Sequence, residues 1–130
     1  MNKHTFKIEM QLPSLNNYIN ACRRNAHAGG AFKRESDSIC AAYIRRAKLP
    51  KIKNPVKIHF EWHERTVKRD LDNVAGYGHK TILDALVSCG VLKDDSPKYV
   101  TGFTDRFVKD RNGGVIVTIE EVGNDDRGKS

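Results

Sequence analysis

The stretch that organises this chain is Val56-Lys57-Ile58-His59-Phe60-Glu61-Trp62-His63. Apolar and polar residues alternate along it, and a period of two predicts a β-strand with one face in the core and the other in polar surroundings. Residues 5–12 repeat this pattern. Two further strands are expected at about residues 99–107 and 115–120, joined by a turn that carries the hairpin signal Asn112-Gly113.

Helical periodicity occurs in two segments. Residues 35–48 predict a helix whose N-cap is Ser36 or Asp37. Residues 73–88 predict a second helix, which Asp72 can cap because its side chain accepts free N–H groups of the first turn.

The polar segment 14–34 contains glycines and has no sustained period, so it is expected to be a long loop. The order is then β-loop-α-β-α-β-β. This order predicts an α+β fold, a single domain with a mixed sheet of about four strands and two main helices. Residues 1–122 are expected to form the domain, and residues 123–130 a polar C-terminal tail.

The composition is that of a basic globular protein. The 130 residues include 23 Lys and Arg against 16 Asp and Glu, which gives a net charge of +7. Such a surface is either simply solvated or suited to a polyanion. No run of 18 apolar residues suggests a membrane span, and the polar N-terminus does not resemble a signal peptide. Three scattered cysteines without a CxxC pair indicate reduced thiols in a cytoplasmic protein rather than disulfides or a zinc site.

Acidic residues gather in Lys68-Arg69-Asp70-Leu71-Asp72-Asn73 and again in Leu92-Lys93-Asp94-Asp95. In an extended segment Asp70 and Asp72 would share one face, about 7 Å apart at Cα. Carboxylate oxygens suit a hard cation such as Mg²⁺ or Mn²⁺. Inside a basic protein, this pattern points to metal-dependent hydrolysis of a nucleic-acid phosphodiester.

Asp95 lies beyond the predicted second helix, which would separate it from Asp70 and Asp72. To reach them, either the chain folds back or the helix is irregular near Ala75-Gly76-Tyr77-Gly78. The alternative is that Asp72 is only a helix cap and that Asp94-Asp95-Ser96-Pro97 is only a turn. The spacing leaves both interpretations open.

The same residues resemble a known family. Arg69-Asp70-Leu71-Asp72-Asn73, then Lys80, then Asp84-Ala85-Leu86, then Gly90-Val91-Leu92-Lys93-Asp94-Asp95 are similar to the signature of RusA-type Holliday junction resolvases. The strand at residues 56–63 and the segment Pro13-Ser14-Leu15-Asn16-Asn17-Tyr18 extend the likeness to about residues 5–121.

The resemblance implies an α+β homodimer that binds four-way DNA junctions and cuts two opposed strands with Mg²⁺, for which Mn²⁺ can substitute. By position, Asp70, Asp72 and Asp95 match the metal-binding aspartates, and Lys80 matches a lysine needed for cleavage. The spacing from Asp72 to Lys80 is longer than in the best-known member, so we place an insertion before Lys80.

Basic residues in the expected long loop, together with two directly before Asp70, are expected to contact phosphates. They are Arg23, Arg24, Lys33, Arg34, Lys68 and Arg69. On the polar face of the strand at residues 56–63, His59, Glu61 and His63 are either DNA or metal contacts or ordinary surface residues. Two rival functions remain: a non-catalytic DNA-binding protein, and a metal-dependent nuclease acting on other branched DNA or on RNA.

Overall fold

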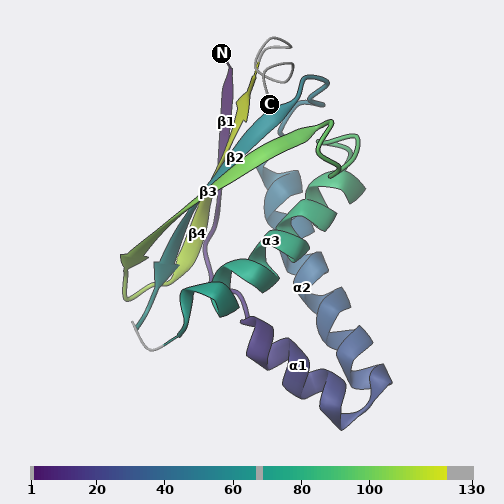
Figure 1. Cartoon of the computed structure of the whole chain (residues 1–130), viewed down its shortest axis with the longest axis vertical. Helices are drawn as coiled ribbons and strands as arrows, with labels where there is room; N and C mark the ends of the chain where they lie inside the picture. The colour runs from purple at the N-terminus through teal and green to yellow at the C-terminus, as the bar shows by residue number, and fades with distance from the viewer. Residues whose placement is uncertain (1, 67–68, 123–130) are drawn as a thin grey trace.

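A computed structural model describes residues 2–66 and 69–122 of the chain, and within them a four-stranded sheet carries three helices on one face (Figure 1). The elements in chain order are β1 (Lys3–Ile8), α1 (Leu15–Arg24), α2 (Ala26–Ala47), β2 (Val56–Glu64), α3 (Leu71–Ser88), β3 (Val100–Lys109) and β4 (Gly114–Glu121). The strand order is β1-β4-β2-β3, with β2 antiparallel to β4 and parallel to β3. The predicted α+β fold with a mixed sheet is confirmed.

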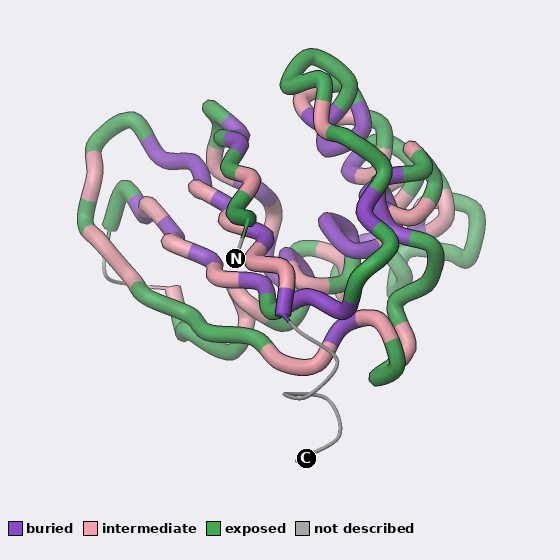
Figure 2. The backbone as a smooth tube through the Cα atoms, turned by 90° about the horizontal axis from the view of Figure 1, so that it is seen from above, coloured by how far each residue is buried: buried purple, intermediate pink, exposed green. Residues whose placement is uncertain are grey.

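The core lies between the sheet and the helices. Ile58, Phe60 and Trp62 of β2 are at most 2% exposed, and so are Val117 and Ile119 of β4. The alternate residues of these strands are partly exposed, so burial alternates along the sheet (Figure 2). The period of two in the sequence therefore marks the face that packs against the helices, as predicted.

The predicted long loop at residues 14–34 is wrong, because most of it is helical. Ser14 caps α1 and forms a reciprocal capping box with Asn17. Asn25 caps α2, where its side-chain oxygen accepts a hydrogen bond from the Ala28 N–H at 2.7 Å. Ser36 lies inside α2, so the expected helix start at Ser36 or Asp37 is also wrong.

Tertiary packing explains why this segment is helical despite its glycines. A Cβ atom on Gly29 would lie only 2.6 Å from the Cys22 Sγ, so this glycine permits close approach of α1 and α2 rather than a turn. The rings of Tyr18, Phe32 and Tyr77 pack together with centroids 5.3–6.1 Å apart and join all three helices. Contacts of this kind outweigh the weak local preference.

Helix α3 is continuous from Leu71 to Ser88, so the irregularity expected at Ala75–Gly78 is absent. Asp70 occupies the N-cap position that the sequence assigned to Asp72, and Asp72 lies in the first turn. Gly90 follows the C-cap Cys89 with a positive φ of 78°, the conformation in which glycine ends many helices. In the described part of the chain, no helix has both the length and the apolar composition needed to cross a membrane.

Gly78 allows α3 to lie directly on the sheet. A Cβ atom at this position would overlap the ring of buried Trp62. We expect Gly78→Ala to lower the free energy of unfolding by about 1–3 kcal/mol, because the overpacked ring must move. Urea denaturation measures this change.

Gly76→Ala is the matched control, since its added Cβ would meet only Leu15 at 4.0 Å. It should raise the stability by up to about 1 kcal/mol through helix propensity. Equal effects of the two variants would contradict close packing of α3 on Trp62.

Candidate functional site

Two aspartates lie at the N-terminal end of α3. Asp70 is the N-cap, with an extended backbone (φ −66°, ψ 138°), and Asp72 is in the first helical turn. The two therefore do not share one face of an extended segment, and that expectation is wrong. Both are exposed, and the Asp70 side chain makes no capping hydrogen bond. The free N–H groups of the helix end favour negative charge here.

Asp95 lies at the opposite end of the helix. The 18 residues of α3 span about 27 Å at the standard rise. The chain after α3 is fixed to that end, because the N–H groups of Val91 and Leu92 both donate to the Leu86 carbonyl. Figure 1 shows this segment at the end of α3 away from its start. Across the described residues, no three His, Cys, Asp or Glu side chains are grouped so that they could hold a metal ion.

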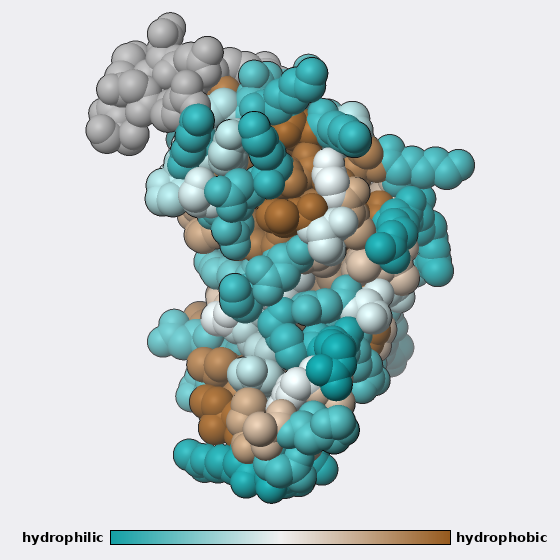
Figure 3. All heavy atoms as spheres, turned by 90° about the vertical axis from the view of Figure 1, so that its right-hand side faces the viewer, coloured by the Kyte–Doolittle hydropathy of each residue, from teal (hydrophilic) through white to brown (hydrophobic). Residues whose placement is uncertain are grey.

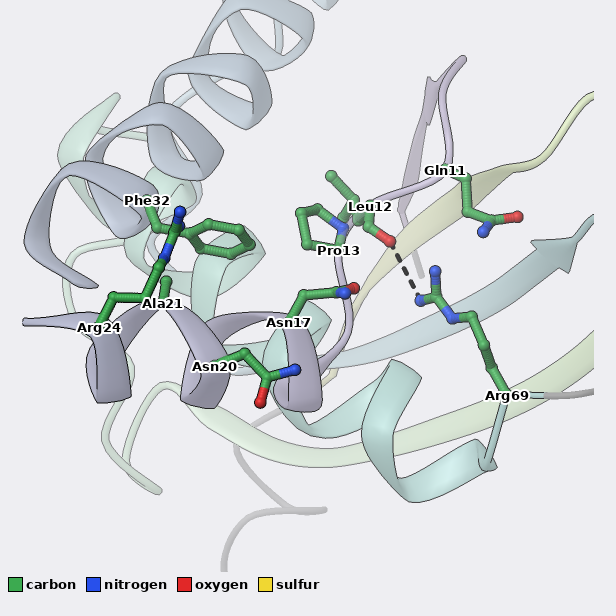
Figure 4. A pocket seen from close by; sticks show the side chains of 9 residues that line it. All are labelled: Gln11, Leu12, Pro13, Asn17, Asn20, Ala21, Arg24, Phe32 and Arg69. Carbon is green, nitrogen blue, oxygen red and sulfur yellow. Dashed lines mark hydrogen bonds between the residues drawn. The ribbon is translucent and has the colours of Figure 1, made fainter. Parts of the chain in front are cut away.

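A pocket of about 600 Å³ lies beside the segment that leads into α3 (Figure 4). Its polar lining includes Asn17, Asn20 and Arg24 of α1, together with Arg69. In Figure 4 the two arginines approach the pocket from different elements. Sequence reasoning missed the two asparagines. Asn17, Asn20 and Arg24 are three and then four residues apart, so they lie on one side of a helix. Recognition of α1 in the sequence would therefore have grouped them.

Arg69 is fixed where the chain enters α3. Its Nε lies 3.1 Å from the Glu64 Oε1, and its guanidinium also donates a hydrogen bond of 3.1 Å to the Leu12 carbonyl. Burial raises the pKa of Glu64, and the charge of Arg69 opposes that rise. The ion pair thus anchors the residue directly before Asp70 to β2.

The histidines of β2 lie on the sheet face opposite the helices. Both ring nitrogens of His63 contact carboxylates, Glu61 at 2.7 Å and Asp110 at 2.8 Å. The hydrogen bond to Asp110, and to a smaller extent that to Glu61, raise the pKa of His63 against the effect of burial. His59 contacts Thr104 and Glu120. These side chains have partners within the sheet.

A model of the family described as Endodeoxyribonuclease RusA matches residues 13–120. The chain belongs to this family. A search of curated proteins finds no match. The matched region contains Asp70, Asp72, Lys80 and Asp95, and family membership places the chain among endonucleases that act on junction DNA.

In this RusA-family chain, Lys80 follows Asp72 by two helical turns. Asp72, Gly76 and Lys80 are spaced by four residues and so follow one side of α3. Lys80 is exposed, and its Nζ lies 3.4 Å from the Asp84 Oδ1. Asp84 therefore restrains where the Lys80 ammonium lies.

Lys33 connects α2 to the same aspartate. Its Nζ lies 2.5 Å from the Asp37 Oδ1 and 3.0 Å from the Asp84 Oδ2. Burial disfavours the charged form of Lys33, but hydrogen bonds to both carboxylates outweigh it and raise the pKa of the ammonium. Thr81 donates a further hydrogen bond of 2.7 Å to Asp37.

The other predicted phosphate contacts differ in their surroundings. Arg23 and Arg24 are exposed in the last turn of α1, and Arg34 is exposed on α2. Lys68 lies outside the described residues. The roles of these residues, and of Lys33 and Arg69, stay predictions.

The ion pairs of Lys33 predict that this residue stabilises the fold, and a stability measurement tests this structural role. Lys33→Met should lower the free energy of unfolding by about 1–2 kcal/mol, because it leaves two neighbouring carboxylates without their shared cation. Arg34→Met, with no ion pair among the described residues, should change it by less than about 0.5 kcal/mol. Chemical denaturation measures both, and an unchanged stability of Lys33→Met would contradict the structural role.

Proposed function

We propose that this RusA-family protein is a Mg²⁺-dependent endodeoxyribonuclease that resolves four-way DNA junctions by paired nicks, with Mn²⁺ able to replace Mg²⁺. The products carry 5′-phosphate and 3′-hydroxyl ends. The observation that carries the proposal is the pair Asp70 and Asp72 at the start of α3, beside a pocket that contains Arg24 and Arg69. The pair suits a metal ion, and the arginines suit phosphate.

The donor atoms of this pair fit a divalent cation. Asp70 does not use its side chain as a helix cap, and neither aspartate has an ion pair within the described residues. Their carboxylate oxygens are thus available, and oxygen is the donor that Mg²⁺ prefers. A bound cation would lower the pKa of a water molecule and offset charge on the scissile phosphate.

The side chains of the protein supply the remaining contributions. Lys80, restrained by Asp84, can place an ammonium near the phosphate where negative charge develops during cleavage. Arg23, Arg24 and Arg34 are exposed and can contact the backbone of DNA arms. The ammonium of Lys33 already contacts two carboxylates, so its contribution to the site is to hold Asp84.

The separation of the aspartates supports a homodimer. Because α3 is continuous, the Asp95 of the same chain is held away from Asp70 and Asp72. Two copies related by a two-fold axis, with their α3 helices antiparallel, would bring the Asp95 end of one copy to the Asp70 end of the other. Such a dimer has two equivalent sites, as a junction with approximate two-fold symmetry requires. A cytoplasmic location, as expected from the sequence, is part of the proposal.

Removal of a single aspartate tests the metal site. Asp70→Asn or Asp72→Asn should abolish cleavage of a synthetic immobile four-way junction in Mg²⁺, because a ligand is lost with little change in volume. Junction binding should survive or tighten, since a negative charge near phosphate is also lost.

Lys80→Ala should lower the cleavage rate by about a hundredfold or more, with a smaller effect on binding.

The matched control is Glu35→Gln, which removes one exposed carboxylate from α2 that does not line the pocket beside Asp70. It should cleave at the wild-type rate, and chelation of Mg²⁺ should stop cleavage by every variant. Wild-type rates for Asp70→Asn and Asp72→Asn would refute the metal assignment. Junction binding without any metal-dependent cleavage by the wild-type protein would favour a non-catalytic binding role.

A further inference from the structure

A second basic site lies at the far end of α3. It is a groove of about 540 Å³ between the end of that helix, residues 51–53 and Tyr99. Its lining combines three lysines with an apolar floor. We call it the lysine groove and define it by Lys51, Ile52, Lys53, Val87, Gly90, Val91, Leu92, Lys93 and Tyr99.

The frame of the lysine groove is held by backbone contacts. The Ile52 N–H donates to the Val91 carbonyl at 2.8 Å, and Ile52 and Leu92 form an isolated parallel bridge. Both bridge residues are buried, whereas Lys51, Lys53 and Lys93 beside them are exposed. Alternation along residues 51–53 thus directs Lys51 and Lys53 to the solvent side.

Tyr99 provides an aromatic surface among the lysines. The Lys93 Nζ lies 5.9 Å from the centroid of its ring, and the Lys98 Nζ lies 5.5 Å from it. The backbone of Tyr99 is fixed because its carbonyl accepts a hydrogen bond of 2.8 Å from the Val56 N–H. An aromatic ring held in place and flanked by cations is the arrangement that binds a stacked base and its phosphate together.

The lysines of the groove form no ion pair within the part of the chain that the structure describes. Among the described residues, no carboxylate lies within 4 Å of the ammonium groups of Lys51, Lys53, Lys93 or Lys98. Four neighbouring like charges repel one another, and a polyanion relieves that repulsion. Figure 3 shows, in its upper half, an apolar area bordered by hydrophilic side chains on the side of the molecule where the end of α3 lies.

We propose that the lysine groove binds a DNA strand, with phosphates on the lysines and an unpaired base against Tyr99 and the apolar floor. The inference rests on the proposed function and extends it, because strands cross from one duplex to another at the exchange point of a junction, and opening of a base pair there would supply the unpaired base. Lys93 directly precedes Asp94 and Asp95, so a strand bound here runs next to the third predicted metal ligand.

Binding in EDTA, where no cleavage occurs, tests the groove. The probes are an immobile four-way junction, a single strand of oligothymidine and a plain duplex, each titrated over a range of salt concentrations. Lys51→Gln/Lys53→Gln should reduce the slope of log Kd against log salt by about 1.4–1.8, the value for two lost phosphate contacts. Tyr99→Leu should weaken binding to the junction and to the single strand by about 5- to 100-fold, and Tyr99→Phe should restore it.

The matched control is Lys7→Gln/Lys57→Gln, which removes two exposed lysines from β1 and β2. Its slope of log Kd against log salt should equal that of the wild type, because these two lysines lie outside the groove. A wild-type slope for Lys51→Gln/Lys53→Gln overturns the proposal, as does wild-type affinity of Tyr99→Leu for the junction and the single strand. A lower melting temperature of the lysine variant with unchanged DNA affinity also overturns it, because the lysines would then only stabilise the C-terminal end of α3.

The groove proposal and the proposed function can fail separately, and the experiments distinguish the two cases. If the protein binds DNA through the groove but never cuts junctions in Mg²⁺, the junction-resolving activity fails and the groove stands. If junctions are cut and the groove variants bind as the wild type does, the groove alone fails.

Discussion

The unbroken hydrogen-bonded helix α3, packed on Trp62 through Gly78, is the constraint on which the rest of the structure depends. It packs against α2, and the two groups of acidic residues lie at its start and just beyond its end. A continuous helix of this length cannot bring its ends together, so its rigidity keeps Asp70 apart from Asp95. A shorter or broken helix would have allowed one chain to assemble the three aspartates. The proposal that a second copy completes the site rests on this one element.

Some of the charged residues near the two ends of α3 have the signs that the helix dipole favours. Asp72 lies in the first turn, where the helix end is positive, and lysines surround the last turn, where it is negative. Between these ends, Lys33, Asp84 and Lys80 form a chain of ion pairs that connects α2 to the exposed side of α3. Among the basic residues that form no ion pair in the described part of the chain, Arg23 and Arg24 lie on α1, and Lys51, Lys53 and Lys93 line the lysine groove beyond α3.

The sequence predicted the sheet better than the helical layer. Alternation in residues 56–63 identified both the strand and its buried face, because side-chain direction in a strand depends only on local geometry. The segment 14–34 was mistaken for a loop because its helices depend on contacts between distant residues, such as Gly29 against Cys22 and Tyr18 against Tyr77. The family motif pointed to the acidic residues, and the sequence left open whether the helix between them is interrupted, whereas the structure shows a continuous α3. Lys33 illustrates the same limit, because its partner Asp84 is 51 positions away.

Mixing two inactive variants tests most directly whether the active site is shared between copies. Asp72→Asn and Asp95→Asn chains, carrying different tags, are combined so that mixed dimers can be purified, and the nicking of a four-way junction in Mg²⁺ is measured. If each site takes Asp70 and Asp72 from one copy and Asp95 from the other, one site of the mixed dimer has all three aspartates, and the dimer should nick one strand. Mixed dimers of Asp70→Asn and Asp72→Asn, which damage both sites, should remain inactive. Absence of nicking by the first mixed dimer, with both parent variants inactive, would contradict the shared site.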